Sequence, residues 1–384
     1  MHIVMIGPFG LRPRGTMAVR ALPMARALAR RGHRATLLLP PWQNPEDAGR
    51  HWEEGNVTVE NIPLPALPTP FFHLVTAFRL ARRALALQPD VVHLFKPKAY
   101  SGLAHWLLVH RSQRTDPRLV VDTDDWEGPG GWNDLAPYTS VQRLFFARQE
   151  RWGLTHADSV TVASRTLESL VWAMGVPPEH VFYVPNGIPD PNLRATPSTE
   201  PIILLYTRFF EFPVRRVVEL LRQVRAQIPP ARMLVVGRGL FNEEKELLQQ
   251  TQEAGLSSAV EYVGWVEPQR LGEVFSRAAL AIYPFDDTLV NRAKCPVKLL
   301  DLLTAGMPVV AEAVGEIRET IRHGETGWLV EPGDVETFAR AVVRLLERPS
   351  LRRRLGETAA HDIRRRRSWD RLAEVVERAY GASQ

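Results

Sequence analysis

The segment from Ala279 to Asp334 constrains the fold of this 384-residue chain more than any other part of it. It contains an apolar run that stops at Pro284, a polar loop, a helical pattern, a glycine turn at Gly306, a second apolar run and a glycine-punctuated loop. This order is typical of parallel sheets, which bind phosphorylated ligands at the carboxyl ends of their strands. The segment therefore predicts a ligand-binding α/β domain.

The same alternation of strand and helix patterns runs along the whole chain and predicts two domains. Apolar runs such as HIVMIG and ATLLLP alternate with amphipathic patterns. Helices are expected at 18–31, 72–87, 103–111 and 144–155. The proline-rich segment PDPNLRATPSTEP then reads as a linker, and a second alternation starts at Pro201. Because the chain is too long for one ordinary core, we expect two Rossmann-like α/β domains with parallel sheets.

The composition, 45% apolar and 24% charged, indicates a soluble globular protein. No run approaches the ~20 apolar residues that span a bilayer, and the first residues, MHIVMIGPFG, lack the basic region and cleavage site of a signal peptide. We therefore expect a cytoplasmic location. The single cysteine, Cys295, excludes internal disulfides and cysteine-based metal sites, which fits a reducing compartment.

Arginine far outnumbers lysine in this chain, because all but five of the 48 basic residues are arginine. The net charge is +5. Two explanations stay open. One is a compositional bias of the source genome. The other is a basic face that binds anionic headgroups, which would bring the chain peripherally to the inner face of an anionic membrane. Nucleic acid is not an expected partner, because the arginines are scattered and not interleaved with aromatic residues.

Several motifs resemble one family in an ordered series. The segments KLLDLLTAGMPVV and ETIRHGETGWLVEPGD are similar to the donor-binding half of retaining family-four glycosyltransferases, and HVFYVPNGIPD, LLYTRFFEF, MLVVGRG and VEYVGWV resemble further landmarks of that family. The resemblance implies the GT-B fold, two Rossmann-like domains facing a central cleft. It implies an acceptor-side domain at 1–190, a nucleotide-sugar-binding domain at 201–365 and a helix at 366–384 that crosses back to the first domain. The implied activity is sugar transfer with retention from a nucleotide diphosphate sugar to a hydroxyl of a glycan, lipid or small molecule, without a cofactor.

In such a transferase without metal, arginine, lysine and helix N-termini neutralise the leaving diphosphate. The resemblance assigns this catalytic role to Arg208, at the end of IILLYTR, and to Lys298, in CPVKLLD. Arg215 or Arg216 is a looser counterpart of a further family cation. Asp301 matches the second carboxylate of the family's pair, which resembles a ribose clamp, whereas Ala293 stands where the first is expected. The donor sugar is therefore undetermined.

Four more residues are expected near the donor. Gly15 and Thr16 follow the first strand, with Thr16 as the N-cap of the next helix, and the resemblance implies that their loop approaches the diphosphate. Gly237 follows the strand MLVVG, and Glu319 lies where the family has a glutamate near the nucleotide. Each has a structural alternative, because glycine turns are common after Rossmann strands and Glu319 could lie on a helix surface.

The segment from Asp122 to Trp126, DTDDW, follows the strand RLVV of the first domain. Its Asp-x-Asp spacing resembles the cation site of another glycosyltransferase fold, GT-A, so a metal-dependent enzyme using Asp122 and Asp124 stays an alternative. Its position in the first domain favours a different role. We place Asp124 and Asp125 at the acceptor side, with Trp126 beside them, where a carboxylate could orient or deprotonate an acceptor hydroxyl.

Three further residues complete the acceptor-side set. His93 lies in the run DVVHLF, Asn186 lies in a turn at the mouth of the cleft, and Glu150 resembles a family glutamate. A lone histidine at a strand end is more often structural. The eleven histidines show no metal-ligand spacing, so no bound metal is expected. A nucleotide-sugar-binding protein with little activity also stays open, because of the missing glutamate at Ala293.

Overall fold

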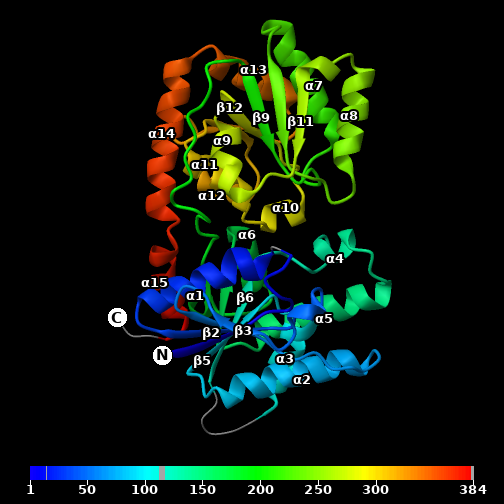
Figure 1. Cartoon of the computed structure of the whole chain (residues 1–384), viewed down its shortest axis with the longest axis vertical. Coiled ribbons are helices and arrows are strands. Elements are labelled where there is room, and N and C mark those ends of the chain that lie inside the picture. The colour runs from blue at the N-terminus through cyan, green and yellow to red at the C-terminus, as the bar shows by residue number, and fades with distance from the viewer. Residues whose placement is uncertain (14, 112–116, 382–384) are drawn as a thin grey trace. The chain divides into compact units, whose positions relative to one another are not determined.

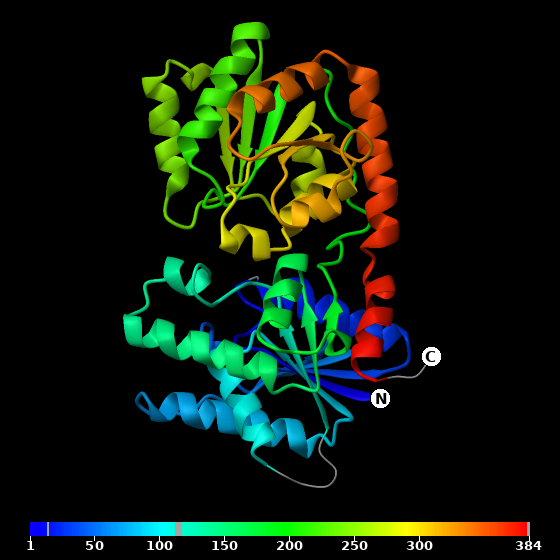
Figure 2. The ribbon, with the colours of Figure 1, turned by 180° about the vertical axis from the view of Figure 1, so that it is seen from behind.

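The computed structural model describes residues 1–13, 15–111 and 117–381, which form two compact units. Unit 1 comprises Met1–Gly187, Ala293–Cys295 and Trp369–Gln384, and unit 2 comprises Ile188–Arg292 and Pro296–Ser368. Each unit has one mostly parallel sheet with helices packed against it (Figures 1 and 2). This confirms the expected α/β class with two Rossmann-like domains. The expected domain limits stay predictions.

The sheet of unit 1 has the strand order β3-β4-β2-β1-β5-β6-β7-β8. All neighbouring strands are parallel except the edge pair β3 and β4. The strands are β1 (His2–Ile6), β2 (Arg34–Leu39), β3 (His51–Glu53), β4 (Val57–Asn61), β5 (Val91–Phe95), β6 (Arg118–Thr123), β7 (Ser159–Val162) and β8 (Val181–Tyr183). The chain order reverses between β1 and β5, so a ligand site is expected beyond the carboxyl ends of these central strands.

The helices of unit 1 confirm the expected helical segments, with shifted starts. A π-helical turn, Met17–Ala21, leads into α1 (Leu22–Arg30). The others are α2 (Phe71–Ala86), α3 (Ala99–Val109), α4 (Trp132–Leu135), α5 (Ser140–Thr155), α6 (Arg165–Ala173) and α15 (Trp369–Ala379). Helix α5 begins four residues before the expected position because Thr139 and Gln142 form a reciprocal capping box. Apolar periodicity alone does not detect such a polar first turn.

The sheet of unit 2 has the order β11-β10-β9-β12-β13-β14, and all its strand pairs are parallel. Its strands are β9 (Ile202–Tyr206), β10 (Arg232–Val236), β11 (Val260–Gly264), β12 (Leu280–Tyr283), β13 (Val309–Glu312) and β14 (Trp328–Val330). Side chains of β9 alternate between two apolar cores, one on each face of the sheet. The chain order reverses between β9 and β12, which defines a second expected ligand edge.

The helices of unit 2 are α7 (Val214–Gln227), α8 (Glu243–Glu253), α9 (Leu271–Phe275), α10 (Leu289–Ala293), α11 (Val297–Ala305), α12 (Glu316–Thr320), α13 (Val335–Leu346) and α14 (Pro349–Arg366). Short 3₁₀ turns occur at Pro45–Asp47, Pro178–His180, Ser257–Ala259 and Pro268–Arg270. No helix within the described ranges is long and apolar enough to cross a membrane. The thiol of Cys295 is buried.

Candidate functional site

A small cavity of about 10 Å³ lies in unit 2 at the carboxyl ends of β9 and β12. Arg208, which follows β9, and Lys298, in the first turn of α11, both line it, together with Tyr206 and Glu211. The Nζ atom of Lys298 lies 3.5 Å from the centroid of the Tyr206 ring, a cation–π contact that holds the ammonium at the wall. The two cations predicted to be catalytic thus line one cavity at the expected ligand edge.

The backbone around Arg208 explains why its side chain is exposed. The hydroxyl of Thr207 accepts a hydrogen bond from the backbone N–H of Phe209 at 2.7 Å, and Phe209 has a left-handed φ of 70° and a buried ring. Gly237, at the end of β10, has a φ of +126°, and a Cβ on it would lie 1.9 Å from the carbonyl oxygen of Thr207. Only glycine permits this approach, so Gly237 shapes the strand end beside Arg208.

Asp301 lies one helical turn beyond Lys298 on α11 and is buried. Its Oδ2 accepts a hydrogen bond from the hydroxyl of Tyr206 at 3.4 Å, so Tyr206 contacts both the cation and the carboxylate. Arg215, on α7, and Glu319, on α12, are exposed, and neither belongs to the residues that line the cavity. The structure therefore brings Arg208, Lys298 and Asp301 together around Tyr206.

An ion-pair network around Glu312, a residue that sequence reasoning missed, supports this cavity. Glu312, at the end of β13, is fully buried and accepts hydrogen bonds from the backbone N–H groups of Phe285 at 2.5 Å and Gly333 at 2.7 Å. Arg216 lies 2.9 Å from Glu312 and 2.6 Å from Asp286. Burial raises the pKa of Glu312, although Arg216 opposes the shift. The network fixes the loop after β12, which contributes Phe285 to the cavity wall.

Unit 1 has a cluster of charged side chains at the carboxyl ends of β5 and β6, which we call the Lys96 cluster: Lys96, Lys98, Asp124, Asp125 and Glu127. The Nζ atom of Lys96 lies 3.0 Å from Asp124, 2.7 Å from Asp125 and 3.5 Å from Glu127. Lys98 donates to Glu127 at 2.7 Å. The sequence predicted the two aspartates but missed both lysines and Glu127. The lysines follow β5 and the carboxylates follow β6, and these two parallel strands are neighbours. The position of both segments after neighbouring strands was the signal that could have predicted their contact.

Burial and ion pairing set the charges of the Lys96 cluster. Burial disfavours the ammonium of Lys96, but the three carboxylates outweigh it and hold the pKa of Lys96 well above its ordinary value. Asp125 is partly buried; desolvation opposes its ionised form, and Lys96 nevertheless keeps the pKa of Asp125 below the usual range. Burial raises the pKa of Asp124, with Asp125 adding to the effect against Lys96. Asp124 is therefore the carboxylate of the cluster that is best suited to accept a proton.

Thr16 has a different role from the expected helix cap. Its side chain makes no capping hydrogen bond, and its hydroxyl instead donates to Oδ2 of Asp124 at 2.6 Å. The expectation fails because the helix begins with a π-helical turn, in which Thr16 already has helical dihedral angles. The contact joins the loop at Gly15 to the Lys96 cluster. Two of the segments predicted as functional therefore meet within unit 1.

Asp122 is buried beneath this loop in an ion pair with Arg20, which the sequence analysis did not single out. The guanidinium donates from Nε to Oδ1 at 2.7 Å and from Nη2 to Oδ2 at 2.6 Å, and Thr161 donates to Oδ2 at 2.6 Å. A cation bound between Asp122 and Asp124 would compete with this guanidinium. Across the described ranges, no group of three or more histidine, cysteine or acidic residues could hold a metal ion. Metal independence stays a prediction.

The structure corrects the expected role of His93. Its side chain is fully buried in β5, with Nδ1 2.8 Å from the hydroxyl of Tyr380 and Nε2 3.1 Å from that of Thr161. Burial lowers the pKa of His93 to about 4, so the ring is neutral at physiological pH. As the third residue of β5, His93 lies within the strand and not beyond its carboxyl end. It packs α15 against the sheet and does not line an acceptor site.

The remaining acceptor-side residues are also buried. Asn186 donates to the carbonyl oxygen of Cys295 at 2.8 Å and accepts from Arg20 at 3.1 Å. The indole of Trp126 is largely buried and donates to the carbonyl oxygen of Pro129, which places it in the packing of its own loop. These contacts show how the loop is held and leave acceptor binding by Asn186 and Trp126 as predictions.

Glu150, on α5, lies next to the Lys96 cluster. Its Oε1 accepts from the backbone N–H of Glu127 at 3.1 Å. Burial, and then the nearby carboxylate of Glu127, raise the pKa of Glu150 to about 8. At neutral pH this side chain is therefore a neutral acid beneath a charged cluster.

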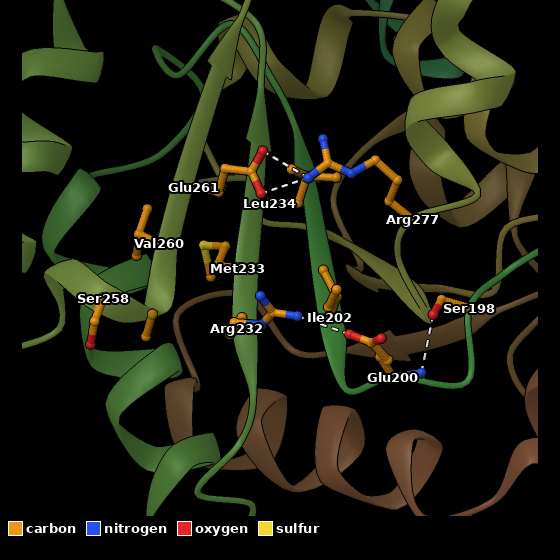
Figure 3. A pocket seen from close by; sticks show the side chains of 11 residues that line it. Ser198, Glu200, Ile202, Arg232, Met233, Leu234, Ser258, Val260, Glu261 and Arg277 are labelled. Carbon is orange, nitrogen blue, oxygen red and sulfur yellow. Dashed lines mark hydrogen bonds and ion pairs between the residues drawn. The ribbon is translucent and has the colours of Figure 1, made fainter.

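A larger cavity of about 520 Å³ lies in unit 2 at the amino ends of β9, β10 and β11 (Figure 3). Its charged residues pair with one another: Arg232 lies 2.8 Å from Glu200, and Arg277 lies 2.6 Å from Glu261. Ligands of such sheets bind at the opposite end of the strands. We therefore place the candidate donor site in the smaller cavity around Arg208 and Lys298.

The comparison with known families agrees with this geometry. Residues 15–187 match the glycosyl transferase 4-like domain, and residues 191–362 match the glycosyl transferases group 1 family. The fold and the cationic cavity define a transferase of the GT-B class. The chain belongs to the group 1 glycosyltransferases, of the family-four type, and is a glycosyltransferase enzyme.

Two curated relatives illustrate this membership. The chain is 24% identical to a phosphatidyl-myo-inositol mannosyltransferase of Mycobacterium leprae over 402 aligned positions, which cover 99% of this chain and 96% of that protein. It is 31% identical over 202 residues to an exopolysaccharide phosphotransferase of Streptomyces coelicolor, covering 52% of this chain and only 21% of that longer protein.

Two solved structures share the fold over the whole chain. Sucrose-phosphate synthase from Thermosynechococcus elongatus aligns with a TM-score of 0.76 and 20% identity, covering 99% of this chain and 98% of that one. HepE from Anabaena, solved in complex with UDP, aligns with a TM-score of 0.71 and 18% identity, covering 99% and 100%. At this identity the likeness establishes the fold.

Proposed function

We propose that this glycosyltransferase transfers a sugar from a nucleotide diphosphate sugar to an acceptor hydroxyl, with retention at the anomeric carbon and without a metal ion or other cofactor. The observation that carries the proposal is the cavity at which Arg208 and Lys298 lie together. Two cations at the carboxyl ends of parallel strands can neutralise the diphosphate as the bond to the sugar breaks. The UDP bound to HepE and the sugar-transfer names of the relatives support a nucleotide donor.

On the donor side, each residue around Tyr206 has a separate task. Lys298 and Arg208 stabilise the negative charge that develops on the leaving diphosphate oxygen. Asp301, one turn along α11, would accept hydrogen bonds from the ribose hydroxyls, and Tyr206 positions it. Gly237 keeps the neighbouring strand end close to Arg208. Arg215 and Glu319, both exposed and outside the cavity lining, are weaker members of the predicted donor set.

On the acceptor side, Asp124 would take the proton of the acceptor hydroxyl. The acceptor oxygen forms its bond to the anomeric carbon on the face that the diphosphate leaves, and its proton passes to a carboxylate or to the departing phosphate. Asp124 suits this step because its pKa is raised, while Thr16 and Lys96 orient its two oxygens. Asp125 remains the anion that pairs with Lys96. The acceptor is a glycan, a lipid-linked molecule or a small molecule.

A donor screen with metal-free enzyme tests the proposal. UDP-, GDP- and ADP-sugars are compared by thermal shift in excess EDTA, and the product of the best donor is examined by proton NMR. We expect a stabilising nucleotide sugar, activity retained in EDTA, and a product with the anomeric configuration of the donor. Loss of activity in EDTA with rescue by manganese would establish the metal-dependent alternative. Binding of a nucleotide sugar without hydrolysis or transfer would establish a binding protein.

A further inference from the structure

A segment of unit 1 outside both candidate sites has an unusual composition. From residue 61 to residue 89 the chain contains no aspartate or glutamate, and its charged residues are Arg79, Arg82 and Arg83. The segment consists of the loop before α2, the helix α2 itself and the turn after it. In a chain with 43 acidic residues, 29 consecutive positions without one mark a surface that does not repel anions.

Large apolar side chains of this segment are exposed. Leu67, in the loop, is 47% exposed, and Phe71, Leu74 and Phe78, on α2, are 59%, 55% and 54% exposed. The spacing of i, i+3 and i+7 places the three helix residues in one stripe, and exposed Arg82 continues it by one turn. We call Leu67, Phe71, Leu74, Phe78 and Arg82 the α2 stripe.

The other side of α2 packs within unit 1. Thr76, Leu80 and Ala84 are buried there, and α2 packs mainly against α3. The helix is in view at the edge of unit 1 from both directions (Figures 1 and 2). It is therefore a well-packed amphipathic helix whose exposed face is apolar at its amino-terminal half and basic beyond it. Single exposed apolar residues are ordinary, but a stripe on one helix face marks an interaction surface.

We propose that the α2 stripe binds the surface of an anionic lipid bilayer. Aromatic and leucine side chains along one helix face can enter the boundary between headgroups and acyl chains. The guanidinium of Arg82 then lies at the level of the phosphates, and no carboxylate of the segment repels them. Arg83 contributes less, because it is paired with Glu60 at 2.7 Å. The stripe does not depend on the proposed sugar transfer, and it would bring the enzyme to a lipid-linked acceptor.

Sedimentation of the full chain with vesicles tests the stripe. We expect binding to vesicles that contain phosphatidylglycerol, weaker binding to pure phosphatidylcholine, and loss of the difference at high salt. The triple variant Phe71→Ser, Leu74→Ser, Phe78→Ser should bind roughly 100-fold more weakly, because it removes three apolar side chains from the lipid phase. Arg82→Gln should bind about 5-fold more weakly to anionic vesicles, and equally to neutral ones.

The matched control is Phe241→Ser, Leu248→Ser, Trp265→Ser, which removes three exposed apolar side chains of unit 2 and should bind like the parent. Donor-induced thermal shifts should be unchanged in the α2 variant, so a failed donor screen and a failed vesicle assay are separate results. Equal vesicle binding by the α2 variant and the parent, or no binding by the parent, would overturn the proposal. A parent dimer that the α2 variant loses would instead assign the stripe to a second copy of the chain.

Discussion

The two units use cations differently at equivalent edges of their sheets. In unit 1, Lys96 is largely buried and lies within 3.5 Å of three carboxylates. In unit 2, exposed Arg208 and partly buried Lys298 line a cavity. The ion pairs of Lys96 hold two loops of unit 1 together, whereas Arg208 and Lys298 lie at a cavity wall on the expected ligand edge. The difference supports the proposal that the edge of unit 2 binds the diphosphate, whereas Lys96 of unit 1 holds its own carboxylates in place.

The largest effect is expected in unit 1. Lys96→Met should lower the free energy of unfolding by about 3–5 kcal/mol, because it leaves buried carboxylates without their cation. Denaturant unfolding followed by fluorescence measures this loss. Lys245→Met, on the surface of α8, is the matched control and should change stability by less than about 0.5 kcal/mol. If the Lys96→Met protein were as stable as the control, Lys96 would not hold its carboxylates in place, and the proposed difference between the cations of unit 1 and unit 2 would be wrong.

In unit 2 the expected effect is on turnover. Arg208→Ala and Lys298→Ala should each lower kcat by roughly 100-fold, about 3 kcal/mol of transition-state stabilisation, while the melting temperature changes little. Initial rates with the donor found in the screen measure the effect. Arg222→Ala, an exposed arginine of α7 paired with Glu219, is the control and should keep the parental rate. Parental rates in both site variants would refute the site assignment.

The smallest effect concerns Glu150, whose pKa is raised to about 8 by burial. The folded protein keeps this proton, whereas the unfolded chain releases it near pH 4. The contribution of Glu150 to the free energy of unfolding is therefore complete below pH 4 and is lost as the pH rises towards 8. Glutamine carries no titratable proton, so the Glu150→Gln variant should lack this loss. Between pH 5 and pH 8 its free energy of unfolding should rise by at least about 1 kcal/mol relative to that of the parent. Melting temperatures of both proteins across this range provide the test. Parallel pH profiles would show that the acid is ionised in the folded protein.

The candidate donor residues were assigned from the family resemblance, and the clear apolar patterns of the strands before them placed them at the carboxyl ends of a sheet. Arg208 lies two residues after the end of β9, and Lys298 lies in the first turn of α11, the second helix after β12. The Lys96 cluster was harder to predict, because its contacts join Lys96 to residues 29 positions away and no local pattern marks a lysine in FKPKAY. Knowing that β5 and β6 are neighbours would have brought the two loops together. His93 was misplaced because a strand pattern does not tell which residue lies within the strand and which lies beyond it.

The scarcity of lysine has a chemical consequence of its own. Of the five lysines, Lys96 and Lys98 belong to the charged cluster, Lys298 lines the cavity, Lys294 is buried, and Lys245 is exposed on α8. Guanidinium groups do not react with acylating reagents at neutral pH, so such reagents would leave most of the basic surface unchanged. Amine acylation in the presence and absence of a nucleotide would therefore serve as a footprint of the candidate sites, with Lys245 as its internal standard.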